Sequence, residues 1–112
     1  MQISTEVIDK SLIVTVQGEI DHHTASAIKD KTQRDYNISG ALNIIFDFTG
    51  VSFMDSSGIG MLIGRYKLIE QSGGSVSVCS ASDNINRIFS MSGLPKIIKS
   101  YKTLDQALKA IS

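Results

Sequence analysis

The sequence predicts an α/β fold, a mixed sheet with helices packed over it. Two observations support this class. The chain opens with two alternating apolar segments spaced as in a β-hairpin, and strand-type and helix-type segments then alternate to its end. Strands that come first as a hairpin and afterwards alternate with helices favour a sheet with both antiparallel and parallel pairs.

The two opening strands are predicted from the alternation of apolar and polar side chains. One pattern covers residues 3–7 and the other covers residues 12–16. Asp9-Lys10 lies between them and predicts a tight hairpin turn. Gly18-Glu19 then ends the second strand.

The next segment has the signals of a helix followed by a buried strand. The helix is expected to begin at Asp21 or Thr24 and to reach about Asn37, where Ser39-Gly40 stops it. Residues 42–48 are mostly large and apolar, as expected for a central strand that is covered on both faces.

A second helix is predicted to run from Ser56 or Ser57, whose hydroxyl would be its N-cap, to about Gln71. Gly60 and Gly64 lie four positions apart on one side of it, where a neighbour could approach closely. Apolar residues at helical spacing form its core-facing stripe: Ile59, Leu62, Ile63, Tyr66 and Ile69. Arg65 is expected to lie largely off this stripe, and Met61 is expected to face solvent or a partner.

The last third of the chain repeats the strand and helix alternation on a smaller scale. A strand is predicted at residues 75–79, and Ser82 is expected to cap a short helix that Ser92-Gly93 ends. Ile97-Ile98 is predicted to be a brief edge strand. A capping box that starts at Thr103 predicts the final helix.

Length and composition indicate a single domain, residues 1–112, with enough chain to bury a core. Eleven basic residues balance eleven acidic ones, which argues against a dedicated nucleic-acid-binding protein. The longest apolar runs are strand-sized and the N-terminus lacks the pattern of a signal peptide, so no membrane span is expected. Cys79 is the single cysteine and is expected to be buried, and the cytoplasm is the expected compartment.

The chemically distinctive feature is the turn Asp55-Ser56-Ser57-Gly58 at the start of the second helix. A helix N-terminus has unpaired N–H donors and a partial positive charge, so it tolerates an added phosphate. Capping by either serine explains the same residues without any modification, and spacing alone favours this simpler role.

Two loops join strand ends to helix starts, residues 18–23 and residues 51–58. If the strands before them are parallel and adjacent, both loops leave the same edge of the sheet, where sites in such folds usually lie. Asp21 and Ser56 are then expected on one surface, although they are far apart in the sequence.

Three motifs resemble those of a known family. They are Phe53-Met54-Asp55-Ser56-Ser57-Gly58-Ile59-Gly60 followed by Gly64-Arg65-Tyr66-Lys67, Gly18-Glu19-Ile20-Asp21-His22-His23-Thr24-Ala25, and Met91-Ser92-Gly93-Leu94 followed by Lys96-Ile97-Ile98. Together they resemble the bacterial anti-sigma factor antagonists, which are small stand-alone STAS-domain proteins, and most closely the sporulation branch that acts on the anti-sigma-F factor. The resemblance spans nearly the whole chain. It implies the STAS fold, a sheet of four or five strands with about four helices mainly on one face.

The resemblance also implies a switch operated by phosphorylation. The first serine of the motif, Ser56, would be phosphorylated by the partner anti-sigma factor, which is itself an ATP-dependent serine kinase. The unphosphorylated protein would bind that factor and free the sigma factor, the phosphorylated protein would be released, and a PP2C-type phosphatase would reset it. Asp21 would help to position the partner. The contact surface would comprise Asp55, Ser57, Gly58, Ile59 and Gly60.

Two other functions fit some of the same residues. Ser56, one of the two histidines and an aspartate supply the residue types of a nucleophilic triad, but no Gly-x-Ser-x-Gly elbow surrounds the serine. No metal is expected, because the chain has only these two histidines and no suitable partner ligands, and His22 and His23 are expected to be exposed residues of the loop or the first helical turn. The glycines do not fit a P-loop, so any nucleotide is expected on the kinase partner and no cofactor is expected here. An antagonist in a general stress-response circuit or another partner-switching circuit would keep the fold and change only the partner.

Overall fold

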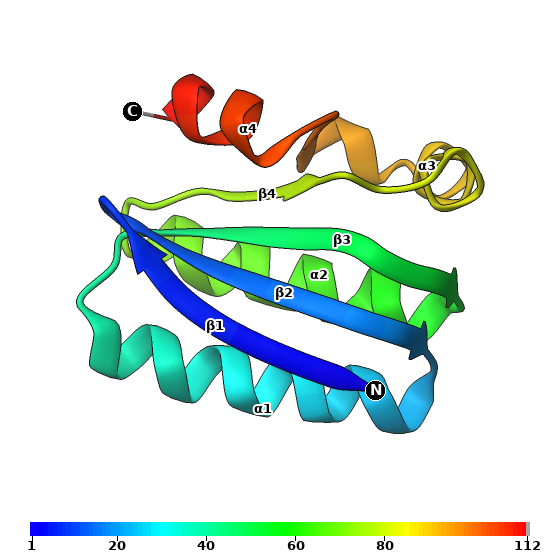
Figure 1. The fold of residues 1–112 in the computed structure, drawn as a ribbon, viewed down its shortest axis with the longest axis horizontal. Coiled ribbons are helices and arrows are strands. Elements are labelled where there is room, and N and C mark those ends of the chain that lie inside the picture. Colours follow the sequence, from blue (N-terminus) through cyan, green and yellow to red (C-terminus); the bar gives the residue numbers. More distant parts are fainter. Residues whose placement is uncertain (112) are drawn as a thin grey trace.

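The chain folds into a five-stranded sheet that has helices on both sides (Figure 1). The computed structural model describes residues 1–111. In chain order the elements are β1 (Gln2–Ile8), β2 (Ser11–Ile20), α1 (His22–Ser39), β3 (Asn43–Met54), α2 (Ser56–Gln71), β4 (Val76–Cys79), α3 (Asp83–Ser92), the 3₁₀ turn η1 (Leu94–Lys96), β5 (Lys99–Tyr101) and α4 (Leu104–Ile111).

The sheet is mixed, as predicted, and its strand order is β1-β2-β3-β4-β5. β1 and β2 pair antiparallel, and the predicted hairpin turn between them is confirmed, with Asp9 at a φ of 54°. The other three pairs are parallel. A parallel connection must cross over a face of the sheet, so a helix separates each of these strands from the next.

One face of the sheet carries most of the core. α1 and α2 lie next to each other against this face (Figure 1). α3 contributes Ile85 and Phe89 to the same core. Phe46, Phe48 and Leu62 are fully buried here. Each such side chain contributes about 1.5–3 kcal/mol of hydrophobic stabilisation. This layer therefore fixes the positions of α1 and α2 relative to the strands.

α4 covers the opposite face over a smaller apolar cluster, to which Ile13, Ile45, Cys79 and Ala107 contribute. The expectation of helices mainly on one face is thus confirmed. Cys79 is fully buried, and burial raises the pKa of its thiol to about 11. Such a thiol stays protonated and unreactive at neutral pH.

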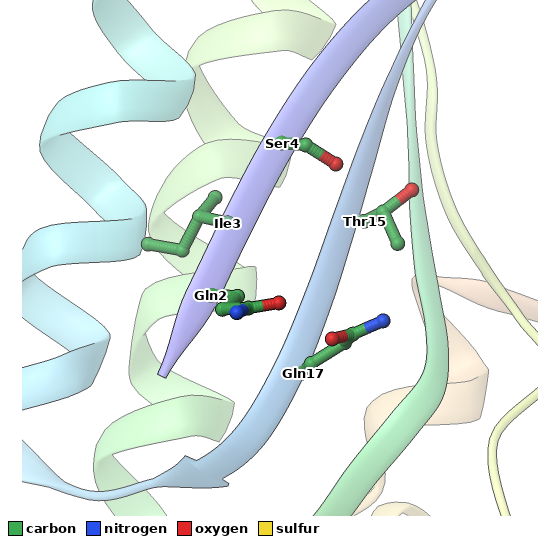
Figure 2. A pocket seen from close by; sticks show the side chains of 5 residues that line it. All are labelled: Gln2, Ile3, Ser4, Thr15 and Gln17. Atoms are coloured by element: carbon green, nitrogen blue, oxygen red, sulfur yellow. The ribbon is translucent and has the colours of Figure 1, made fainter.

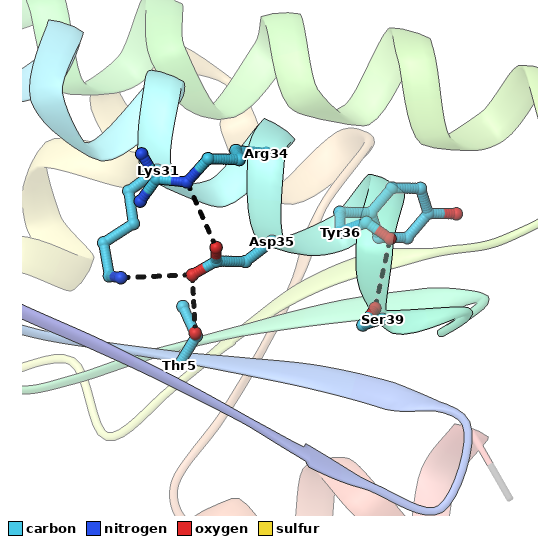
Figure 3. A network of polar contacts seen from close by, with 6 residues as sticks. All are labelled: Thr5, Lys31, Arg34, Asp35, Tyr36 and Ser39. Carbon is cyan, nitrogen blue, oxygen red and sulfur yellow. Dashed lines mark hydrogen bonds and ion pairs between the residues drawn. The ribbon is translucent and has the colours of Figure 1, made fainter.

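A polar cluster fastens the edge strand β1 to α1 (Figure 3). The carboxylate of Asp35 accepts a hydrogen bond of 2.7 Å from the Thr5 hydroxyl and pairs with Lys31 at 3.1 Å and Arg34 at 3.4 Å. These partners, the Thr5 hydroxyl foremost, hold the pKa of Asp35 below its usual range. The cluster explains how a long edge strand stays fixed against the helix layer.

β1 and β2 leave a polar hollow on the side of the sheet that carries α4, in the part that α4 does not cover (Figure 2). Its lining comprises Gln2, Ile3, Ser4, Thr15 and Gln17. These side chains are neutral, and none of them belongs to the predicted site.

Two strand predictions need correction. β3 does not stop at residue 48 but continues to Met54, because β2 extends beside it and the register runs through irregularities to the pair Ile20–Met54. Residues 97–98 are not a strand, and β5 begins only at Lys99. The 3₁₀ turn Leu94–Lys96, with Pro95 at its second position, precedes them, and the N–H groups of both isoleucines donate to the carbonyl of Leu94, at 3.0 and 2.9 Å.

The helix boundaries follow the predicted caps closely. α1 ends before Gly40 and α3 ends before Gly93, which have φ values of 74° and 80° that suit glycine. Ser82 caps α3 as predicted, accepting from the N–H of Ile85. The box at Thr103 forms only in part, because the Gln106 side chain accepts from Lys102 instead. Among residues 1–111, no helix combines the length and apolar character needed to cross a membrane.

Candidate functional site

The site begins where two neighbouring parallel strands end. β2 and β3 finish opposite each other at Ile20 and Met54, and the N–H of Asp55 donates to the carbonyl of Ile20 at 3.1 Å. The loops before α1 and α2 therefore leave the same edge of the sheet, and Asp21 and Ser56 lie on one surface. This prediction from the sequence is confirmed.

α1 starts with a complete capping box. The carboxylate of Asp21 accepts hydrogen bonds of 2.9 Å from the N–H groups of both His23 and Thr24. The hydroxyl of Thr24 in turn accepts from the N–H of Asp21 at 2.8 Å. The bond from Thr24 is the main reason that the pKa of Asp21 lies below its usual value. The cap stabilises the charged form of the carboxylate and fixes the loop.

α2 starts with an aspartate cap as well, which corrects the prediction that a serine caps it. The carboxylate of Asp55 accepts a hydrogen bond of 2.8 Å from the N–H of Ser57. Ser56 and Ser57 consequently occupy the first two positions inside the helix. A carboxylate one residue earlier reaches the same backbone donors, so neither hydroxyl is required for capping.

Ser56 is exposed, and its hydroxyl makes no hydrogen bond to any residue from 1 to 111. Gly60, one turn further along, is also exposed, and Ile59 is half-buried. Gly58 is buried, and a Cβ placed on it would lie 2.5 Å from the Cγ of Met54. Gly58 therefore packs on the inner side of the turn, whereas the hydroxyl of Ser56 is accessible for modification.

A groove separates α1 from α2 and starts at this surface. Its volume is about 410 Å³. The two glycines predicted to let a neighbour approach closely instead leave open space, because a Cβ on either Gly60 or Gly64 would meet nothing within 4 Å. The residues lining the groove are His22, Ala25, Ser26, Lys29, Ser57, Gly60, Met61, Gly64 and Arg65.

Two residues of α2 that were expected outside the apolar stripe are buried, and for Met61 this corrects the expectation that it faces solvent or a partner. Met61 is 7% exposed and Arg65 is 6% exposed. The predicted apolar stripe is present, with Leu62 and Ile69 fully buried. The stripe packs on the sheet, however, while α1 covers a second side of α2, which sequence periodicity alone does not reveal.

Within residues 1–111, the hydroxyl of Ser56 is not hydrogen-bonded to the histidines or aspartates that were considered as its partners in a nucleophilic triad. His22 and His23 are exposed in the first turn of α1, with their rings 5.6 Å apart edge to face. Neither ring is hydrogen-bonded to Ser56 within residues 1–111. The described part of the chain also contains no cluster of three or more histidine, cysteine or acidic side chains able to hold a metal.

Comparison with known sequences gives one family. The profile of the STAS domain matches residues 2–107. An anti-sigma F factor antagonist from Paenibacillus polymyxa is 38% identical over 96% of this chain and 92% of its own length. An anti-sigma-B factor antagonist from Listeria monocytogenes is 32% identical over 88% of this chain and 89% of its own length.

Solved structures agree with the sequence relatives. The anti-sigma factor antagonist SpoIIAA in its unphosphorylated form has a TM-score of 0.83 at 27% identity, covering 98% of this chain and 96% of that one. The phosphorylated form of SpoIIAA from Bacillus has a TM-score of 0.75 at 27% identity, covering 99% of this chain and all of the other. The similarity extends over the two loops and the helix starts described above.

Proposed function

The chain belongs to the STAS domain family, and from this premise we propose that it is an anti-sigma factor antagonist that works by partner switching. The whole chain, residues 1–112, acts as one regulatory STAS domain without an enzymatic activity of its own. In its unphosphorylated form it binds an anti-sigma factor and releases the sigma factor. Phosphorylation of Ser56 by that same partner, a serine kinase, ends the binding. The relatives of F type favour a sporulation circuit.

The choice of Ser56 as the phosphorylated residue rests on one observation. Its hydroxyl is exposed in the first turn of α2 and has no hydrogen bond to the described residues, so a kinase can reach it without breaking a structural contact. Ser57 is half-buried and its N–H is engaged by Asp55. Accessibility therefore favours the first of the two serines as the acceptor.

Electrostatics explains how a phosphate there can act on binding while sparing the fold. A phosphate adds roughly −1.5 to −2 charges, and the N-terminus of a helix favours such a charge by about 0.3–1 kcal/mol at an exposed site. At an interface the same group must lose its hydration next to Asp55, which carries a charge of the same sign. The modified protein should thus stay folded and lose its partner.

The proposed contact surface is built around this serine. Asp21 positions the partner from the neighbouring loop, and Ile59 and Gly60 add area on the outer side of α2. Asp55 and Ser57 contribute through the cap. Gly58 belongs to the surface only indirectly, by keeping the turn in place.

The remaining components of the switch follow from this assignment. A PP2C-type phosphatase removes the phosphate and restores binding. The ATP is held by the kinase partner, and the antagonist itself needs no metal or other cofactor. The protein acts in the cytoplasm, on proteins and not directly on nucleic acid or membranes.

The test is a kinase assay with the cognate anti-sigma F factor and ATP, read by mass spectrometry of the intact protein and its peptides. We expect one phosphate on wild type and on Ser57→Ala, and none on Ser56→Ala. Ser56→Ala should still bind the partner and should no longer be released by ATP. Labelling of Ser56→Ala to the level of wild type would reject the assignment.

A second circuit is favoured by the relatives of B type, one of which is 32% identical. A general stress-response antagonist would use the same serine and the same surface. Measuring Kd for an anti-sigma F factor and an anti-sigma B factor under identical conditions separates the two, because only the cognate kinase should bind tightly and label Ser56.

A further inference from the structure

Arg65 is a buried cation that forms no ion pair within residues 1–111. Its side chain lies between α2 and α1 and is only 6% exposed. Its Nη1 donates to the Oε1 of Gln33 at 2.6 Å, while its Nε has no hydrogen-bond partner. No carboxylate of residues 1–111 forms an ion pair with it, since the ion pairs found there involve Asp35 with Lys31 and Arg34.

This arrangement is unfavourable for the isolated protein. A buried charge normally has a paired opposite charge, and a buried N–H without an acceptor costs free energy. Burial accordingly lowers the pKa of Arg65, and the charge of Asp30 only partly offsets this. A guanidinium nevertheless remains protonated at neutral pH. The free protein thus holds a buried charge for which a ligand could supply an ion-pair partner.

The groove beside Arg65 has the shape and the charge to admit such a ligand. Small residues on both helices, Ala25, Ser26, Gly60 and Gly64, leave it open. The side chains with basic groups that line it are His22, Lys29 and Arg65, and no aspartate or glutamate lines it. It is open along its length, which suits a side chain carried on a protein segment better than an enclosed small molecule.

The groove is also continuous with the proposed partner surface. Ser57 and Gly60 belong to both, and His22 follows directly after Asp21. A partner that docks on the start of α2 therefore lies next to the entrance of the groove.

Resting on the proposed function, we propose that the groove between α1 and α2 receives an acidic side chain of the anti-sigma factor, whose carboxylate pairs with the guanidinium of Arg65. The carboxylate accepts from N–H groups of the Arg65 guanidinium, whose side chain lines the groove, and so supplies an ion-pair partner for this buried cation. The groove thereby adds a recognition element that is distinct from the phosphorylation switch at Ser56.

The test measures Kd for the cognate anti-sigma F factor with two variants of the groove. Arg65→Met keeps the volume and removes the charge, and we expect about a ten- to a hundredfold higher Kd with an unchanged or higher Tm. Gly64→Leu fills the groove without changing any charge and should weaken binding to a similar degree. Arg34→Met is the matched control, since it removes an exposed arginine outside the groove and should leave Kd unchanged.

A double-mutant cycle identifies the occupant. Each acidic residue of the partner's contact region is replaced by alanine and combined with Arg65→Met, and one of them should lose its effect in that background. Wild-type binding by Arg65→Met, or a loss of binding that couples to no acidic residue, would overturn the proposal. If Arg65→Met does not fold, normal binding by Gly64→Leu overturns it instead. If the wild-type protein does not bind the anti-sigma F factor, the proposed function is wrong. This result differs from every result that would overturn the groove proposal alone.

Discussion

The starts of α1 and α2 have the same kind of cap but differ in the residue at the third helical position. Each follows a strand of the same parallel pair, and each is capped by an aspartate, Asp21 or Asp55. At the third helical position α1 has Thr24, whose hydroxyl bonds back to the N–H of Asp21. α2 has Gly58 at the third position, packed against Met54, and its cap forms only the bond to Ser57.

Because of this difference, the start of α1 is interpreted as a structural support and the start of α2 as a surface that can be modified. At α1 the backbone and side chains of the first turn satisfy one another, so the loop is closed by its own hydrogen bonds. At α2 the corresponding turn exposes the hydroxyl of Ser56 with no bond to the described residues. Replacing that hydroxyl, or adding a charge to it, should change what the surface binds and leave the fold intact. Four predictions test this division.

The largest effect is expected for Ser56→Asp. A carboxylate at the first position of α2 imitates part of the phosphate charge, so binding to the anti-sigma factor should weaken by about a hundredfold. The helix N-terminus should accept the charge, and Tm should stay within about two degrees of wild type. Isothermal titration and thermal unfolding measure the two. Ser4→Asp on the exposed edge strand is the control and should bind normally.

Gly58→Ala probes the inner side of the same turn. A Cβ there would lie 2.5 Å from Cγ and 2.8 Å from Sδ of Met54, so the buried methionine must move. We expect a loss of about 1–2 kcal/mol in the free energy of unfolding. Gly60→Ala is the matched variant, because its Cβ meets nothing within 4 Å, and it should gain about 0.5–1 kcal/mol. Equal unfolding free energies for both variants would contradict the packing described here.

Thr24→Val tests whether the start of α1 is a structural support. It removes the hydroxyl that closes the capping box and keeps the volume of the side chain. The free energy of unfolding should fall by about 0.5–1.5 kcal/mol in urea titrations. Phosphorylation of Ser56 by the kinase should continue, because the α2 turn is untouched. A variant as stable as wild type would show that the box contributes little.

The smallest effect is a pH dependence at Asp21. The folded-state pKa of this carboxyl lies below its unfolded value because of the bonds from Thr24 and His23. Its stabilising contribution is therefore present above the unfolded pKa and disappears as the pH falls through the folded pKa. The Tm difference between wild type and Asp21→Asn should be largest at neutral pH and should vanish in strong acid. A Tm difference that does not change with pH would show that the charge of the Asp21 carboxylate does not contribute to the stability of the cap.

Local signals in the sequence were sufficient for most of the fold. Alternation at residues 3–7 and 12–16, the turn at Asp9 and the glycine after α1 depend on neighbours only a few residues away, so they can be recognised in one dimension. The Asp-Ser-Ser-Gly motif pointed to the same turn that the structure exposes. The parallel pairing that brings Asp21 and Ser56 together could be stated only as a condition, which the sheet then fulfilled.

Contacts between distant segments decided the rest. Periodicity gives α2 one apolar side, but α1 packs against a second, and this is why Met61 and Arg65 are buried. β3 runs on to Met54 because β2 is there to pair with it, although no apolar run continues that far. Sequence by itself determined which residues can form each element and each cap. Only the tertiary structure decided which sides are covered, because burial depends on neighbours that are remote in the chain.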